Sequence, residues 1–218
     1  MLPKAIVFDV DGVLFDTEVM IRRGWEEVSA RMGYPQVGLN YPSYVGQSRR
    51  DIMARLLEVY GPGFDGAVFL EDVTAFCIAH WESEGLPFKP GLMEILDYLK
   101  EKSVPIALAT STRSTRTARR MEITGLGHYF QAIVTGDMVA HSKPDPEIYR
   151  TACEQLGVDP ADAIAVEDAP NGIRSAHGAG IPTVMIPDQV PYSPELDPLL
   201  LTHLPSLHAL REYLTELE

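Results

Sequence analysis

The feature that most limits how this chain can fold is the alternation of short apolar runs with helix-like segments from Pro90 onward. Four such runs are separated by stretches with helical spacing: Ile106–Thr110, Ala132–Thr135, Ala163–Glu167 and Thr183–Ile186. An earlier run, Ala5–Asp9, has the same composition and is predicted to be the first strand of the same sheet. Short strands that alternate with helices indicate βαβ units. The sequence therefore predicts an α/β fold, with a Rossmann-like parallel sheet covered by helices on both faces.

A second pattern interrupts this alternation directly after the first strand. Residues 17–87 contain three segments with helical periodicity, Val19–Met32, Arg49–Tyr60 and Gly66–Ser83, separated by breaks rich in glycine and proline. We interpret this block as an inserted α-helical cap domain. The α/β core domain would then consist of residues 1–16 and 88–218, with a last helix over Ser206–Leu217.

Charge and composition limit the partners of the chain. Its 218 residues carry a formal net charge of -13, which argues against nucleic acid and anionic membranes, because both require a basic face. A small anionic substrate stays possible, since a local cation can override the global charge. The two cysteines are too few for a disulfide framework, and no apolar stretch approaches the length of a membrane span. We expect a cytoplasmic protein that is a monomer or a weak homodimer.

Two carboxylates follow the first strand. Asp9 ends the apolar run, and Asp11 stands two positions later, on the same side of an extended chain. Gly12 then permits a sharp change of direction. A simple β-hairpin is the alternative interpretation, because Asp-Gly between apolar runs is a strong hairpin signal. A hairpin does not need a second carboxylate at the end of a buried strand, where desolvation is costly without a cation.

Further polar residues are predicted at the same edge of the sheet. They are Thr110-Ser111-Thr112 after the second strand, Glu167-Asp168 after the fourth, and Ser142-Lys143-Pro144-Asp145 ahead of the helix after the third. Each group has an ordinary alternative role as a helix cap or a surface loop. In an open parallel sheet, however, ligands bind at the carboxyl ends of the strands. Converging carboxylates favour a divalent cation such as Mg²⁺, and a lysine with hydroxyl groups suits a phosphoryl group.

Four ordered motifs resemble those of the haloacid dehalogenase superfamily, in its branch with a helical cap after the first motif. They are Phe8-Asp9-Val10-Asp11-Gly12-Val13-Leu14-Phe15-Asp16-Thr17, Ala109-Thr110-Ser111, Ser142-Lys143-Pro144-Asp145-Pro146-Glu147-Ile148-Tyr149 and Val166-Glu167-Asp168-Ala169-Pro170-Asn171-Gly172-Ile173. The match covers nearly the whole chain and is most similar to the β-phosphoglucomutase-like phosphatases. The first motif alone is moderately specific, whereas the ordered set is strongly so.

The resemblance implies a catalytic role for four residues. Asp9 would be the nucleophile that forms an aspartyl-phosphate. Asp11 would act as general acid toward the leaving oxygen and then as general base toward water. Thr110 and Lys143 would hold the phosphoryl oxygens and offset the charge that develops on them.

The same resemblance implies a metal site and substrate contacts. Mg²⁺ would be bound by Asp9, by Asp168 and by the backbone carbonyl of Asp11, with Glu167 acting directly or through water. Three further residues would contact the substrate: Ser111, Asn171 and Arg49, the last within Gly46-Gln47-Ser48-Arg49 of the cap. Arg49 could equally be a solvated residue at the start of a helix.

These inferences predict a Mg²⁺-dependent phosphatase that acts on a small phosphorylated metabolite, most simply a sugar phosphate. The alternatives are a hexose phosphomutase and a non-catalytic protein that binds phosphometabolites. Asp11 argues against a dehalogenase, because the dehalogenases of the superfamily lack this second acid. Against a mutase, Ile21 occupies the position where the resembled phosphoglucomutases carry a histidine in the first cap helix.

Overall fold

A computed structural model describes residues 1–45, 47 and 49–218 of the chain. The chain divides into two compact units. The core unit consists of Met1–Asp16 and Pro87–Glu218, and the helical unit consists of Thr17–Leu86.

The core unit is built on a parallel sheet of six strands. The strands are β1 (Ala5–Phe8), β2 (Ile106–Thr110), β3 (Ala132–Thr135), β4 (Ala163–Glu167), β5 (Thr183–Met185) and β6 (Thr202–His203). They lie in the order β3-β2-β1-β4-β5-β6, and every neighbouring pair is parallel. This order reverses direction between β1 and β4, as in doubly wound α/β folds. The predicted α/β fold with a parallel sheet is therefore confirmed.

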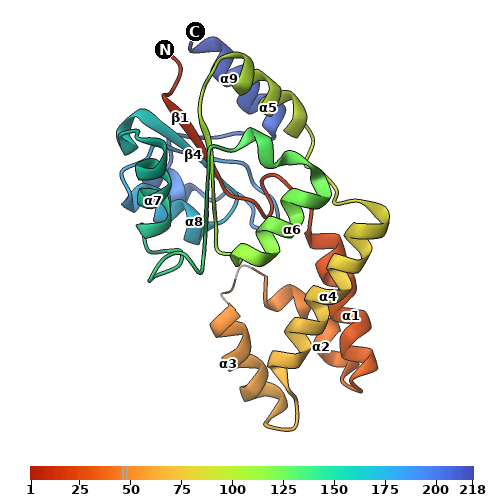
Figure 1. Ribbon diagram of the computed structural model, residues 1–218. Coiled ribbons are helices and arrows are strands. Elements are labelled where there is room, and N and C mark those ends of the chain that lie inside the picture. Colours follow the sequence, from red (N-terminus) through yellow and green to blue (C-terminus); the bar gives the residue numbers. More distant parts are fainter. Residues whose placement is uncertain (46, 48) are drawn as a thin grey trace. The chain divides into compact units, whose positions relative to one another are not determined.

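Helices cover both faces of this sheet (Figure 1). They are α5 (Leu92–Glu101), α6 (Ser114–Thr124), α7 (Glu147–Leu156), α8 (Pro170–Gly178) and α9 (Leu207–Glu216), with 3-10 turns η2 (Leu126–Tyr129), η3 (Pro160–Asp162) and η4 (Pro194–Leu199). The helices α7 and α8 lie on one face, and α5, α6 and α9 lie on the other (Figure 1). Because both faces are covered, the central strands are apolar throughout rather than alternating.

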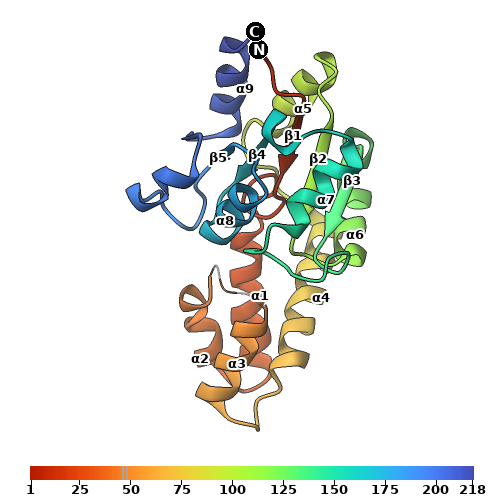
Figure 2. The same ribbon diagram turned by 90° about the vertical axis from the view of Figure 1, so that its left-hand side faces the viewer.

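Small side chains let α7 lie close to the sheet. Alanines of β1, β2, β3 and β4 are fully or almost fully buried and pack with Ile148, Tyr149 and Ala152 of α7. The close approach matters for function, because Tyr149 projects from this helix toward the end of β4. At the other end of the sheet the chain termini lie side by side (Figure 2), and the Met1 amino group donates a hydrogen bond to the Leu217 carbonyl.

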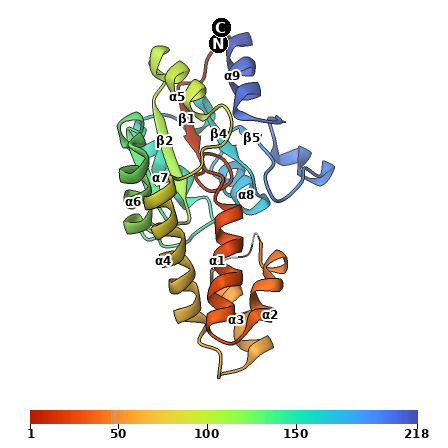
Figure 3. The same cartoon turned by 90° about the vertical axis from the view of Figure 1, so that its right-hand side faces the viewer.

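The helical unit contains α1 (Glu18–Arg31), α2 (Pro35–Leu39), η1 (Tyr41–Ser43), α3 (Arg49–Tyr60) and α4 (Gly66–Glu84). Within it, α1 and α4 run alongside each other (Figure 3). Its small core is aromatic: the Trp25 ring lies about 5 Å from the rings of Tyr41, Tyr44 and Phe69. Contacts of this kind let a short helical unit bury apolar surface without a sheet.

One α-helix and one strand of the described residues were not expected from the sequence. Pro35–Leu39 forms a short helix where glycine and proline predicted a loop, because proline is well suited to the first turn of a helix. Thr202–His203 adds an edge strand too short to show a period. In the described part of the chain, no helix is both long and apolar enough to cross a membrane.

Candidate active site

The polar residues of the candidate site meet where the strand order reverses. Asp9 directly follows β1 and Glu167 ends β4, and these two strands are neighbours in the sheet. The backbone amide of Asp9 donates a hydrogen bond to the Val166 carbonyl at 2.9 Å, which extends the pairing to the end of the strand. Because the two apolar strands are neighbours and an acid stands at the carboxyl end of each, the two carboxylates lie side by side.

Lys143 joins these two carboxylates. Its Nζ lies 2.5 Å from Asp9 Oδ1 and 2.6 Å from Glu167 Oε1. The side chain of Lys143 is 7% exposed and that of Glu167 is 1% exposed, so these charges are almost entirely out of water. The lysine reaches the strands from the loop before α7, beside a cis Lys143-Pro144 peptide bond. Ion pairs at this depth are maintained only with several well-placed partners.

Glu167 has such partners on both of its oxygens. Tyr149 donates from its hydroxyl to Glu167 Oε1 at 2.6 Å, and the Asp168 amide donates to Oε2 at 3.2 Å. Gly172 lies so near that a Cβ at this position would approach within 1.9 Å of the Glu167 carboxylate. A side chain at position 172 would therefore displace the Glu167 carboxylate. With a glycine there, Glu167 keeps its contact with Lys143.

The buried charges alter the pKa values of the cluster. Burial raises the pKa of Asp9 to about 7, and Glu167 adds to this rise while Lys143 opposes it. Burial, with repulsion from Glu167 and Asp9, also raises the pKa of Asp168 well above its usual value. Burial opposes the charge on Lys143, but attraction to Asp9 and Glu167 outweighs it and raises the pKa of the ammonium group. The single positive charge of Lys143 thus offsets only part of the negative charge of the three neighbouring carboxylates.

The donor set fits a hard divalent cation. Asp9, Glu167 and Asp168 each present a carboxylate oxygen, and these oxygens all lie within 4.8 Å of one another. Oxygen ligands with excess negative charge suit Mg²⁺. The turn after β1 also makes room for Asp168: Gly12 has φ +84°, and a Cβ there would lie 2.4 Å from Asp168 Oδ2. An acidic cluster is therefore present at this edge, and its chemistry fits Mg²⁺.

Asp11 is held by residues that the sequence analysis did not single out for it. Arg120 Nη1 donates to both carboxylate oxygens of Asp11 at 2.8 Å, and Thr112 Oγ1 donates to Oδ2 at 3.0 Å. A buried arginine always needs a partner, but α6 carries three arginines, and the sequence does not say which of them faces inward.

The other predicted residues of the core unit lie as follows. Thr110 is buried at the end of β2, where its hydroxyl accepts a hydrogen bond from the Thr112 amide at 3.1 Å. Ser111 is exposed and accepts a hydrogen bond from Ser142, the neighbour of Lys143, at 3.0 Å. Asn171 lies in the first turn of α8 and accepts a 3.4 Å hydrogen bond from Arg174.

Arg49, the predicted substrate residue of the cap, belongs to the helical unit. It is exposed at the start of α3, and its Nη2 lies 2.9 Å from Glu71 Oε1 of α4. Gly46 and Ser48, from the same predicted segment, lie outside the described residues.

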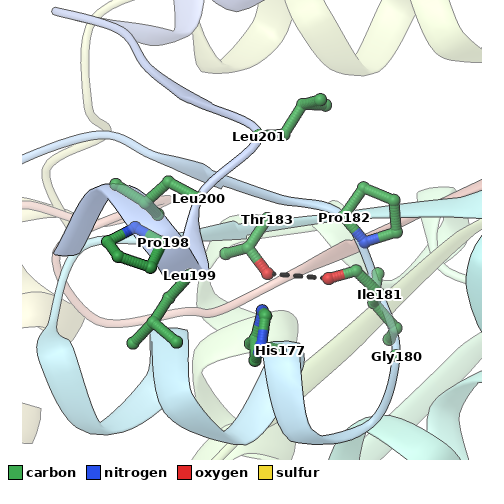
Figure 4. Close-up of a pocket in the computed structure, with 9 residues that line it drawn as sticks. All are labelled: His177, Gly180, Ile181, Pro182, Thr183, Pro198, Leu199, Leu200 and Leu201. Atoms are coloured by element: carbon green, nitrogen blue, oxygen red, sulfur yellow. Dashed lines mark hydrogen bonds between the residues drawn. The ribbon is translucent and has the colours of Figure 1, made fainter.

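A cavity of about 300 Å³ occurs elsewhere in the core unit (Figure 4). Its lining comes from the end of α8, the beginning of β5 and residues 198–201. Thr183 and Pro182 mark the amino end of β5, whereas the acidic cluster lies at carboxyl ends of strands. The cavity is therefore not part of the candidate site.

Comparisons with known proteins agree on one family. The model of the haloacid dehalogenase-like hydrolase family matches residues 6–186. The chain is 34% identical over 183 residues to a phosphorylated carbohydrates phosphatase of Thermotoga maritima, and this alignment covers 82% of each protein. It is also 30% identical over 188 residues to a phosphoglycolate phosphatase of Thiobacillus denitrificans, over 84% of this chain and 83% of the relative.

A solved structure shares the fold over nearly the whole length. The crystal structure of CbbY from Rhodobacter sphaeroides in complex with phosphate matches with a TM-score of 0.79 and 29% identity. This match covers 96% of both chains.

Proposed function

The chain belongs to the haloacid dehalogenase-like hydrolase family and is a phosphoric monoester hydrolase, and we propose that it hydrolyses a small sugar phosphate through a phosphorylated Asp9. The observation that carries the proposal is the contact of Lys143 with both Asp9 and Glu167 beside three clustered carboxylates. The Lys143 ammonium group can bind the phosphoryl group, and the Asp9 carboxylate beside it can act as the nucleophile.

In the first step, a carboxylate oxygen of Asp9 attacks phosphorus, and the bond from phosphorus to the ester oxygen breaks. Asp11 gives its proton to that leaving oxygen, so the alcohol departs neutral. Lys143, with the Thr110 hydroxyl, faces the phosphoryl oxygens and offsets their negative charge. The products of this step are the alcohol and the acyl phosphate of Asp9.

In the second step, water attacks the phosphorus atom of the acyl phosphate. Asp11, now ionised, takes a proton from the water, and the bond between phosphorus and Asp9 breaks. Inorganic phosphate leaves, Asp9 is again a carboxylate, and Asp11 is again protonated. The same residue thus serves as acid and then as base, with protons balanced over the cycle.

We assign Mg²⁺ to Asp9, Asp168 and the Asp11 carbonyl. Glu167 is the supporting member, because Lys143 and Tyr149 already engage its Oε1. When bound, the cation offsets negative charge that the carboxylates and the phosphate would otherwise concentrate there. The acidic cluster with raised pKa values of Asp9 and Asp168 supports this assignment.

The helical unit is proposed to act as a cap that selects the substrate. The guanidinium of Arg49 has several N–H donors, which suits the oxygen atoms at the non-reacting end of a sugar phosphate. The relative named as a phosphorylated carbohydrates phosphatase, and a crystal structure of a CbbY mutant in complex with xylulose-(1,5)bisphosphate, support a sugar phosphate as the substrate class. A cytoplasmic location is proposed because both cysteine thiols are free and buried, and a monomeric or weakly dimeric state is proposed with it.

Phosphate release from a panel of phosphomonoesters tests the proposal. We expect release from sugar phosphates with Mg²⁺ and none in excess chelator. To separate hydrolase from mutase, β-glucose 1-phosphate with a trace of the bisphosphate is supplied and both products are followed. We expect inorganic phosphate to exceed glucose 6-phosphate, because Ile21 lacks the hydrogen-bonding ring of a histidine. The reverse ratio would assign the chain to the mutases.

A further inference from the structure

Asp11 and Asp9 are held by different cations, although only one residue separates them in the chain. Asp9 contacts Lys143, whereas Asp11 contacts Arg120. Two carboxylates so close in sequence repel each other, and separate cationic partners fix them in separate orientations. The side chain of Asp11 keeps 34% of its surface exposed, so it is accessible where the Asp9 carboxylate is almost fully covered.

The place of Arg120 in α6 is explained by Asp11 rather than by packing. The buried face of α6 consists of Thr117, Arg120 and Met121. An arginine on such a face loses hydration, and this loss is tolerable only with a charged partner. Its side chain is 10% exposed, and its Nη1 lies 2.8 Å from both Asp11 oxygens. The neighbouring Arg119 is 40% exposed and pairs with Glu122 on the surface.

A second donor defines the orientation of the Asp11 carboxyl group. Thr112 Oγ1 donates to Asp11 Oδ2 from the loop after β2, while Arg120 donates from α6. Donors from two different elements restrict the carboxyl group more than either donor alone. Asp11 is also outside the group of oxygens formed by Asp9, Glu167 and Asp168.

We propose that Arg120, assisted by Thr112, is a positioning residue for Asp11. The contact holds the Asp11 side chain apart from the carboxylate cluster and reserves it for proton transfer. This inference rests on the proposed function, in which Asp11 is the acid and base. Arg120 acts through Asp11 and does not itself contact the reacting atoms.

Leaving-group dependence distinguishes positioning from a general structural role. Glucose 6-phosphate has a poor leaving group and needs a proton, whereas p-nitrophenyl phosphate has a good one and does not. Since kcat/KM reports the first irreversible step, Arg120→Met should lower it about 10- to 100-fold for glucose 6-phosphate. The loss for p-nitrophenyl phosphate should stay within about threefold. Arg120→Lys should recover part of the loss, because it keeps a cation.

Matched variants make the result decisive. Arg119→Met removes the same charge from the surface of the same helix and should leave both esters unaffected. Thr112→Val removes one donor and no buried charge, so it also serves if Arg120→Met folds poorly. It should lower kcat/KM for glucose 6-phosphate selectively, but by less than Arg120→Met.

In an Asp11→Asn background, Arg120→Met should not lower kcat/KM any further. Mg²⁺ binding, measured by calorimetry, should stay within about twofold of wild type, because Arg120 is outside the cluster.

Equal losses on the two esters, or a loss that persists in the Asp11→Asn background, would overturn the role of Arg120. A wild-type protein that hydrolyses neither p-nitrophenyl phosphate nor any sugar phosphate of the panel would instead overturn the proposed function, and this inference with it.

Discussion

Gly12 and Asp168 approach so closely that only a glycine fits: a Cβ on Gly12 would lie 2.4 Å from Asp168 Oδ2. Gly12 also has φ +84°, a conformation that costs other residues about 1–2 kcal/mol. The turn after β1 therefore shapes the acidic cluster as well as the backbone.

Gly12→Ala should displace Asp168 and weaken Mg²⁺ binding by about 10- to 100-fold, as measured by calorimetry. Gly157→Ala is the matched control, because Gly157 has φ +67° but, among the described residues other than its chain neighbours, none has an atom within 4 Å of the added Cβ. It should lose stability through backbone strain alone and keep its Mg²⁺ affinity. Equal Mg²⁺ affinities in the two variants would mean that the contact with Asp168 is not needed.

Lys143→Met should lower kcat roughly 10²- to 10³-fold, because it removes the ammonium group that offsets charge on the phosphoryl oxygens. Mg²⁺ binding should survive, since all three carboxylates remain. Lys102→Met provides the control: Lys102 pairs with Glu218 near the C-terminus. Phosphate release and calorimetry measure the two effects, and a Lys143→Met enzyme as fast as Lys102→Met would remove Lys143 from the mechanism.

Mg²⁺ affinity should fall as the pH decreases through 7. Burial raises the pKa of Asp9 to about 7 in the metal-free protein, so below this pH a proton competes with the cation for the carboxylate. Well above pH 7 the carboxylate is already ionised, and this contribution to the pH dependence disappears. Calorimetry in two buffers of different ionisation enthalpy should detect more proton release on binding near pH 6 than near pH 9. Proton release that does not change between these pH values contradicts the raised pKa.

Arg49→Ala should raise KM for sugar phosphates and leave KM for p-nitrophenyl phosphate unchanged, because the nitrophenyl group carries none of the sugar hydroxyl groups that the guanidinium would bind. Glu71→Ala is the paired control, since it breaks the same ion pair with Arg49 but keeps the guanidinium group. Steady-state kinetics on both esters separates the two. If both variants raise KM for sugar phosphates equally, the ion pair matters and Arg49 does not bind substrate.

Much of the fold could be predicted because its signals are local. The apolar runs that became β1, β2 and β4 are buried on both faces, so their composition alone identifies them as parallel strands. The helix over Pro35–Leu39 was missed because it is shorter than two helical turns, and glycine and proline are equally common in loops. The first strand was predicted to run to Asp9, but β1 ends one residue earlier, at Phe8.

Part of the candidate site was predictable because parallel strands bring their carboxyl ends to one edge of the sheet. Asp9 follows β1 and Glu167 ends β4, and these strands are neighbours, so strand order suffices to pair the two acids. The contact of Arg120 with Asp11 spans 109 positions and depends on the rotation of α6, which no local pattern encodes. The space beside Gly172 is likewise visible only once Glu167 is in place.

The central claim is that Asp9 becomes phosphorylated during turnover, and rapid acid quench followed by peptide mass spectrometry tests it most directly. Wild-type protein quenched during turnover of a sugar phosphate with Mg²⁺ should carry one phosphoryl group on the peptide that contains Asp9. The folded Asp9→Asn protein should carry none and should release no phosphate. Phosphate release at wild-type rates by Asp9→Asn, or a phosphoryl group on another residue of the wild-type enzyme, would contradict the account.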